Sequence, residues 1–104
     1  MARFDVYANP APAERAHTPY LLDVQNDYIS GLASRVVIPL RSEADFGRQA
    51  KGLNPSFLVH DAAVVLDTAA IGAIAAQLLR KPVLSLRAQH TVITAALDTL
   101  FGGF

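Results

Sequence analysis

The chain has 104 residues, no cysteine, and nine basic against nine acidic side chains, so its formal net charge is zero. This length fits one domain, residues 1–104, and leaves no room for a second. Without cysteine there are no disulfides, no thiolate chemistry and no zinc sites built on sulfur, which fits a reducing compartment. The charge balance argues against non-specific nucleic-acid binding, because contacts to phosphate supply much of that affinity.

The apolar content is high for a chain of this size. Hydrophobic residues make up 52%, charged residues 17%, and the mean hydropathy is +0.29. A domain this short buries only roughly 60–65% of its unfolded surface. The surplus therefore predicts a homodimer with an apolar interface. The simpler alternative is that alanine inflates the apolar count.

The N-terminal residues and the most apolar stretch of the chain predict a cytoplasmic protein without a membrane segment. Charged residues appear among the first five positions, before any apolar run, so no signal peptide is visible. The most apolar stretch, residues 62–79, is interrupted by Asp67 and Gln77. It is therefore interpreted as core strands rather than a membrane span.

Alternating polar and apolar residues predict two strands and a third apolar run in the first half of the chain. Residues 3–8 place Phe4, Val6 and Ala8 on one face, opposite Arg3, Asp5 and Tyr7. Residues 20–25 alternate in the same way, and Ser30-Gly31 is a turn signal. Residues 35–40 are rich in β-branched side chains and predict a strand. They contain Pro39, and proline in a strand is expected at an edge, at a bulge or near a strand end.

The second half is less regular until its last segment. Residues 42–55 predict an excursion with a short strand or a turn of helix. Residues 56–60 and 63–68 predict a hairpin around Asp61-Ala62, although glycine is absent from that turn. Residues 71–79 fit a strand or a helix, and residues 83–86 fit a short strand.

The C-terminal segment predicts an amphipathic helix. Its apolar stripe falls at i, i+3, i+4, i+7 and i+8, that is at Ile93, Ala96, Leu97, Leu100 and Phe101. Ser85 or a neighbour is a candidate cap for its start, and Gly102-Gly103 ends it. Five or more strands before one terminal helix indicate an α+β class that is mainly β, a compact barrel or a strongly bent sheet.

No set of residues points clearly to catalysis or to metal binding. The histidines at 17, 60 and 90 lie in three predicted elements without ligand spacing, so no metal site and no cofactor are expected. Asp23 and Asp27 are a candidate carboxylate pair, and a solvated surface arrangement is the alternative. His60 and Asp61 with Arg35 or Arg41 have the residue types of a ribonuclease, with surface charge as the alternative.

Two segments carry a resemblance to a known family. They are Leu22-Asp23-Val24-Gln25-Asn26-Asp27 and, after a short turn, Arg35-Val36-Val37-Ile38-Pro39-Leu40. With Arg3 to Tyr7, Asn54-Pro55, Asp61, Asp67-Thr68 and the terminal helix, they resemble the CcdB toxins of toxin–antitoxin modules. The resemblance covers nearly the whole chain, and residues 42–52 match only by length. It implies an SH3-like barrel of the CcdB and MazF type with one C-terminal helix, dimerised through a broad apolar surface.

The resemblance also implies an activity that works by binding. Such toxins bind the A subunit of DNA gyrase, insert the helix ends of the dimer between its subunits, and trap the cleaved-DNA state until a CcdA-like antitoxin neutralises them. The implied gyrase contacts fall on Tyr28, Ile29, Asp98, Phe101, Gly102, Gly103 and Phe104. This chain departs from the family at Gly102, where a tryptophan is usual. Phe104 either replaces that aromatic anchor or belongs to a tail without a role.

Two alternatives to gyrase poisoning remain on the same barrel. Relatives of the MazF and Kid type cut messenger RNA, and a divergent CcdB homologue could keep the fold without poisoning gyrase. Fold alone does not decide among these activities. The matches lie in the gyrase-poison motifs, so a topoisomerase poison that is not an enzyme is the expectation.

Overall fold

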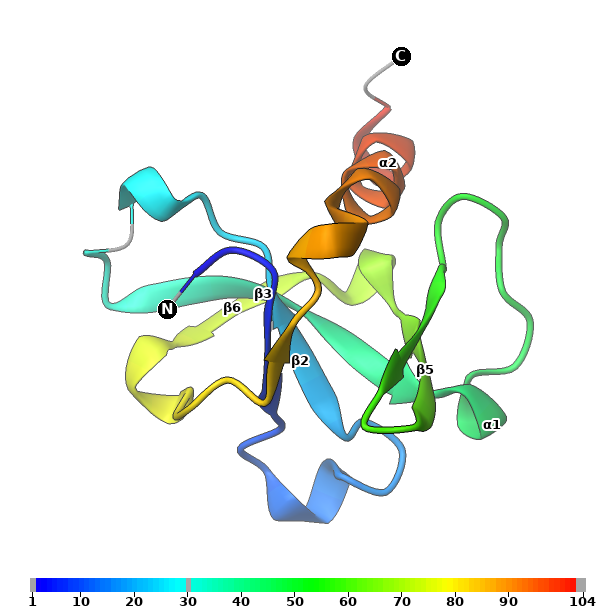
Figure 1. Cartoon of the computed structure of the whole chain (residues 1–104), viewed down its shortest axis with the longest axis horizontal. Coiled ribbons are helices and arrows are strands. Elements are labelled where there is room, and N and C mark those ends of the chain that lie inside the picture. The colour runs from blue at the N-terminus through cyan, green and yellow to red at the C-terminus, as the bar shows by residue number, and fades with distance from the viewer. Residues whose placement is uncertain (1, 30, 103–104) are drawn as a thin grey trace.

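The computed structural model describes residues 2–29 and 31–102, and the strands found within them form one antiparallel sheet (Figure 1). The strands are β1 Asp5–Ala8, β2 Tyr20–Asp23, β3 Ser34–Ser42, β4 Ser56–Val59, β5 Ala62–Leu66, β6 Gly72–Ala75 and β7 Leu84–Ser85. The helices are α1 Glu43–Phe46 and α2 His90–Phe101, and the 3-10 turns are η1 Pro12–Glu14, η2 Asp27–Ile29, η3 Thr68–Ala70, η4 Ala76–Leu78 and η5 Arg87–Gln89.

The sheet is organised around β3. Its strand order is β4-β5-β3-β2-β1-β7, and β6 pairs with β3 off this path. The sheet bends strongly around its core, and α2 projects from it at the C-terminal end of the chain (Figure 1). The mainly β, SH3-like architecture with one C-terminal helix is therefore confirmed.

The expectation that Pro39 marks an edge, a bulge or a strand end is wrong, because β3 is the central and longest strand. One side of β3 pairs with β2, and the other pairs with β6 up to Val37 and with β5 from Leu40 onward. Pro39 lies in the gap between these two partners. Its carbonyl accepts a hydrogen bond from the Asp67 N–H (3.0 Å), and no ladder bond requires the N–H that proline lacks.

The hairpin between β4 and β5 is confirmed, but its turn is one residue earlier than expected. Val59 pairs with Ala62, so the two turn residues are His60 and Asp61 rather than Asp61 and Ala62. Both have positive φ, 48° and 67°, as a type I′ turn requires. Aspartate and histidine tolerate this conformation better than most residues, which explains a tight turn without glycine.

Both faces of the central strands are buried, although the alternation predicted half-buried strands. The main core packs Val6, Leu22 and Ile38 against α2. A second, smaller cluster on the other face contains Tyr7, Leu21, Val37 and Leu79. Tyr7 is therefore buried where the pattern placed it outside, and Ala8 is exposed where the pattern placed it inside.

Two segments whose structure the sequence left open, and the start of α2, have a defined structure. The ambiguous segment forms β6 followed by η4, and residues 42–55 contain one turn of helix, α1. Ser85 does not cap α2: its Oγ accepts the Arg87 N–H (3.1 Å) at the start of η5, and no side-chain hydrogen bond caps α2 at Gln89.

The stripe of α2 packs on the core at its N-terminal end only. Ile93 and Ala96 are fully buried, and Leu97 packs against the main core. Leu100 is half-buried, whereas Phe101, the last residue of the apolar stripe, is 69% exposed. The far end of α2 therefore extends beyond the core, with Phe101 open to contact.

Candidate functional site

The loop between β2 and β3 presents two large apolar side chains to solvent. η2 carries Tyr28, which is 96% exposed, and Ile29, which is 49% exposed. Both are among the positions that the sequence singled out. Leu32 in the same loop is 55% exposed, so three exposed large side chains lie close together in the sequence, and contiguous apolar patches of this kind mark interaction sites.

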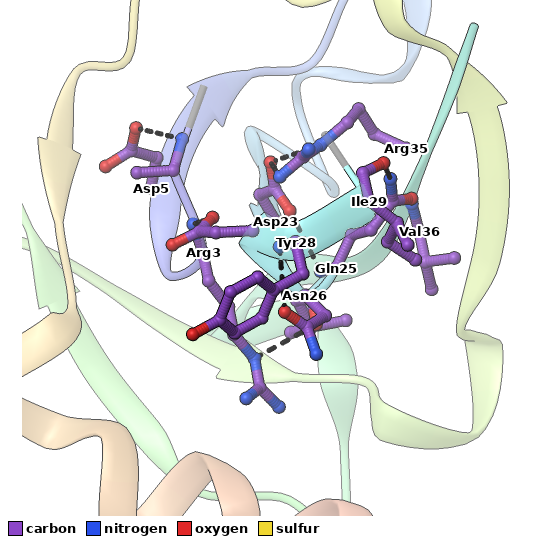
Figure 2. Close-up of polar contacts among 12 residues, drawn as sticks. Arg3, Asp5, Asp23, Gln25, Asn26, Tyr28, Ile29, Arg35 and Val36 are labelled. Atoms are coloured by element: carbon purple, nitrogen blue, oxygen red, sulfur yellow. Dashed lines mark hydrogen bonds and ion pairs between the residues drawn. The ribbon is translucent and has the colours of Figure 1, made fainter. Parts of the chain in front are cut away.

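The buried side chain of Gln25 connects this loop to the sheet (Figure 2). Its Oε1 accepts the Val36 N–H (2.9 Å), and its Nε2 donates to the Ile29 carbonyl (3.0 Å). The Val24 N–H donates to the Val36 carbonyl (3.0 Å), and the Gln25 Oε1 takes the place of the Val24 carbonyl as the acceptor of the Val36 N–H. One amide therefore fixes the loop to β3 at the base of the exposed residues.

Polar contacts at the loop surface hold η2 from the other side. The Asn26 Oδ1 accepts the Tyr28 N–H (2.9 Å), an Asx turn that starts η2. Asp27 Oδ1 accepts the Arg3 N–H (2.8 Å). The ion pair between Arg87 and Asp27 is 3.7 Å long and half-exposed at both ends, so it contributes little. The loop is thus tied to β3 through Gln25 and to the N-terminal segment through Asp27.

An ion pair between Asp23 and Arg35 lies fully buried beside Gln25 (Figure 2). The Arg35 Nε donates to Asp23 Oδ2 (2.8 Å), and Nη2 lies 2.6 Å from the same oxygen. Asp23 Oδ1 accepts the Gln25 N–H (3.0 Å). Burial raises the pKa of Asp23, against the opposing effects of the Gln25 N–H and the Arg35 guanidinium.

This arrangement overturns the two acid–base sets considered from the sequence. Asp23 is buried against Arg35 and Asp27 is exposed on the loop, so they do not act as a carboxylate pair. His60 and Asp61 form a hairpin turn, Arg35 is enclosed in the sheet, and Arg41 pairs with Asp67 (3.0 Å). No ribonuclease-like trio forms from these residues.

A different histidine joins Arg41 in a surface cavity that the sequence did not reveal. His17, Arg41, Asp45, Phe46 and Asp67 line a hollow of about 450 Å³. The Arg41 guanidinium is already paired with Asp67, and two carboxylates face the same space. Because carboxylates repel phosphate groups, this hollow is unfavourable for binding the phosphate backbone of a nucleic acid. His60 and His90 lie elsewhere, in the hairpin turn and at the start of α2.

The C-terminal end of α2 supplies the other described positions. Gly102 ends the helix in the left-handed region (φ 68°, ψ 43°), and its N–H donates to the Asp98 carbonyl. Asp98 and Phe101 are exposed. Figure 1 shows η2 and the end of α2 as two separate projections, and no hydrogen bond or ion pair between the described residues joins them. Gly103 and Phe104 lie outside the described residues.

Residues 3–103, nearly the whole chain, match the model of a protein family described as CcdB protein. The chain belongs to the CcdB family. CcdB proteins are toxins of toxin–antitoxin modules, and the barrel-like sheet with its C-terminal helix agrees with the CcdB fold. A comparison with proteins of curated function found no match.

The CcdB motif around Gln25 has a structural meaning that the sequence alone did not show. The sequence singled out Tyr28 and Ile29 as contact residues. It named Gln25, Asp27 and Arg3 only within the family motifs, with Asp27 also as a candidate carboxylate, and not as the residues that hold the loop. The partners of Gln25, Val36 and Ile29, become visible only when β2, η2 and β3 are placed together.

Proposed function

We propose that this protein is the toxin of a type II toxin–antitoxin module and that it binds the A subunit of DNA gyrase. It traps the complex in which gyrase has cleaved the DNA, and it acts by binding rather than by catalysis. Membership of the CcdB family supports the toxin class. The observation that carries the proposed contact surface is Tyr28, which is 96% exposed on a loop held by a buried amide.

The physical argument rests on preorganisation. An exposed aromatic side chain on a mobile loop loses conformational entropy when a partner orders it, which weakens binding. The two hydrogen bonds of Gln25 and the Asx turn at Asn26 order the η2 backbone before any partner arrives. Tyr28 can therefore act as a hot-spot residue at low entropic cost.

The end of α2 is the second part of the proposed surface. Phe101 is 69% exposed, with Asp98 one turn before it and Gly102 directly after it. The family's tryptophan position holds Gly102, whose open left-handed conformation turns the chain after the helix. In this proposal Phe104 supplies the missing aromatic contact, and the affinity for gyrase is lower than in relatives that carry the tryptophan.

The remaining partners follow from the same proposal. The toxin works in the cytoplasm as a homodimer and is neutralised by a CcdA-like antitoxin. The proposed dimer covers strand surface and part of the helix. Val92, which is 47% exposed on α2, and Leu32, which is 55% exposed on the loop before β3, are large apolar side chains available to such an interface. Within the described residues, no helix has the length and apolar character needed to cross a membrane.

Binding of the purified dimer to purified gyrase A subunit tests the contact surface. Tyr28→Ala should weaken this binding at least ~30-fold, because truncating a central aromatic residue costs ~2 kcal/mol or more. Leu58→Ala is the matched control, since Leu58 is 66% exposed on β4 and outside the proposed surface. Equal affinities for Tyr28→Ala and the unmodified protein contradict the proposed surface.

A further inference from the structure

A second surface hollow is lined by three cationic side chains. Its volume is about 310 Å³, at the lower end of the range for small-molecule sites. Arg15 comes from the turn after η1, and Arg80 and Lys81 come from the segment after η4. The Gln77 amide and the apolar side chains of Pro10 and Leu78 complete the wall. These segments are the blue turn at the bottom of Figure 1 and the yellow turn at its left.

The three cations have no carboxylate partner among the described residues. Arg35, Arg41 and Arg87 form the ion pairs found within residues 2–29 and 31–102. No acidic residue lines the hollow around Arg15, Arg80 and Lys81. In a chain with zero net charge, this is a local concentration of uncompensated positive charge. Concave surfaces lined by one sign of charge attract ions of the opposite sign.

Arg15 is oriented before any ligand binds. Its Nε donates to the Asn9 carbonyl (2.6 Å), which leaves its terminal amino groups available. Asn9 is itself buried, with its side chain bonded to the Thr18 carbonyl (2.9 Å) and to the Ala11 N–H (2.9 Å). A guanidinium fixed in this way suits the bidentate recognition of an oxyanion.

We propose that this hollow binds the phosphate group of a small molecule. Three cations match a dianionic phosphate better than a single carboxylate, which would leave two charges without compensation. The confined hollow and the zero net charge disfavour a nucleic-acid backbone, which calls for an extended basic surface. Pro10 and Leu78 offer an apolar wall to an organic group attached to the phosphate.

The site is independent of the proposed gyrase surface. In Figure 1 the segments that carry its lining residues, the turn after η1 and the segment after η4, lie at the bottom and at the left, whereas the end of α2 projects at the top. Tyr28 and Phe101 do not line it. Phosphate binding therefore goes beyond the proposed function, and each can hold if the other fails.

Calorimetric titration of the full chain at constant ionic strength tests this site. The titrants are inorganic phosphate, adenosine monophosphate, hexaglutamate and a short single-stranded oligonucleotide without a terminal phosphate. The two phosphates should bind, and a higher affinity for adenosine monophosphate would identify a phosphorylated organic molecule as the ligand. Equal affinities would identify free phosphate.

Two charge-removing variants locate the binding. Arg80→Gln should weaken phosphate binding about tenfold, because hydrogen bonds to charged groups are the stronger ones. Arg48→Gln removes a cation that has no carboxylate partner and lies outside the hollow, so it should leave the affinity unchanged. Circular dichroism checks that both variants fold, and Lys81→Gln replaces Arg80→Gln if that variant does not.

Three outcomes overturn the proposal. The first is no measurable heat with either phosphate. The second is an equal loss of affinity in Arg48→Gln and Arg80→Gln, which would mean diffuse charge attraction. The third is tighter binding of hexaglutamate or of the oligonucleotide than of both phosphates, which would assign the hollow to a macromolecule.

Discussion

The side-chain amide of Gln25 donates a hydrogen bond of 3.0 Å from Nε2 to the carbonyl oxygen of Ile29. This bond ties a buried residue that lies just after β2 to the loop whose side chains are exposed. The same amide accepts the Val36 N–H through Oε1, so the loop is fixed relative to the central strand. Gln25 is therefore the side chain that ties the proposed contact surface to the central strand, while Asp27 ties it to the N-terminal segment.

Gln25→Glu should loosen this loop without removing the bond to Val36. A carboxylate still accepts the Val36 N–H, but it cannot donate to the Ile29 carbonyl and faces that oxygen with negative charge. Hydrogen exchange of the amides in residues 28–32 should accelerate by roughly two- to tenfold, since a hydrogen bond of net ~0.5–1.5 kcal/mol is lost. The Ile29 carbonyl keeps only its longer bond from the Leu32 N–H (3.4 Å).

Gln49→Glu is the control for this measurement. The Gln49 Nε2 also donates to a backbone carbonyl, that of Asn54 (2.9 Å), in a different loop. Its substitution should leave exchange in residues 28–32 unchanged. Unchanged exchange in Gln25→Glu would show that the amide does not hold the loop.

Asp23→Asn should cost far more stability than Asp27→Asn. Removing the Asp23 charge leaves the Arg35 guanidinium buried without a counter-ion, and breaking a buried pair costs about 3–5 kcal/mol. Asp27 is exposed, its amide replacement still accepts the Arg3 N–H, and its ion pair is worth below about 1 kcal/mol. Urea unfolding of the two variants measures the difference.

A double replacement separates charge from packing at the same position. Asp23→Leu combined with Arg35→Met removes both buried charges, and exchanging a buried ion pair for apolar side chains is often neutral. The double variant should recover only part of the stability lost in Asp23→Asn, because leucine cannot accept the buried Gln25 N–H, and an unpaired buried donor costs ~1–3 kcal/mol. Equal midpoints for Asp23→Asn and Asp27→Asn would mean that the pair is solvated rather than buried.

Because Tyr7 is buried, we expect the free energy of unfolding to fall at alkaline pH. Burial, followed by the nearby Asp5 and Asp23 carboxylates, raises the pKa of Tyr7 above its ordinary value of 10.0. The folded state then retains a proton that the unfolded state releases above about pH 10. Stability should therefore fall as the pH rises through and beyond that value.

Tyr7→Phe tests this and also removes a buried hydroxyl without a hydrogen-bond partner among the described residues. The free energy of unfolding at pH 7 should stay unchanged or rise by up to about 1 kcal/mol. The alkaline loss should become shallower, as followed by urea unfolding between pH 8 and 11. Tyr28→Phe, on the exposed loop, is the control and should keep the slope of the unmodified protein. An unaltered slope in Tyr7→Phe would contradict the assignment.

Two variants of the C-terminal tail should change the action on gyrase in opposite directions. Deleting Phe104 should abolish gyrase-dependent toxicity without altering folding, because it is the proposed aromatic anchor. Gly102→Trp should strengthen gyrase binding by restoring the family's side chain. It should also lower stability by about 1 kcal/mol or more, because φ is 68° at this residue. Toxicity that survives the deletion would show that Phe104 is not the anchor.

Local patterns predicted the elements that depend on local chemistry. Glycine after an apolar stripe predicted the end of α2 at Gly102, alternation predicted β1 and β2, and two apolar runs predicted the β4–β5 hairpin. The errors have long-range causes. Pro39 is tolerated in the central strand because β3 changes partner beside it, and no local signal reports that Leu40 pairs with Leu66 and Val37 with Gly72.

Long-range contacts also decide which residues form the candidate site. Tyr7 is buried because Leu79, far along the chain, packs with it on the second face of the sheet. Phe101 follows the apolar period of α2, yet the helix extends past the core before reaching it. The exposed residues Tyr28 and Ile29 came from the family resemblance, and the contacts of Gln25 came only from the assembled sheet.

A plasmid-cleavage assay with purified gyrase tests the central claim most directly. The purified protein, gyrase, supercoiled plasmid and ATP are incubated, and the reaction is stopped with detergent and protease. If the protein traps the cleaved-DNA complex, linear plasmid should accumulate with protein concentration, and Tyr28→Ala should require at least ~30-fold more protein for the same effect. If no linear plasmid appears at concentrations that are toxic in cells, the protein does not poison gyrase, and the proposed function is wrong.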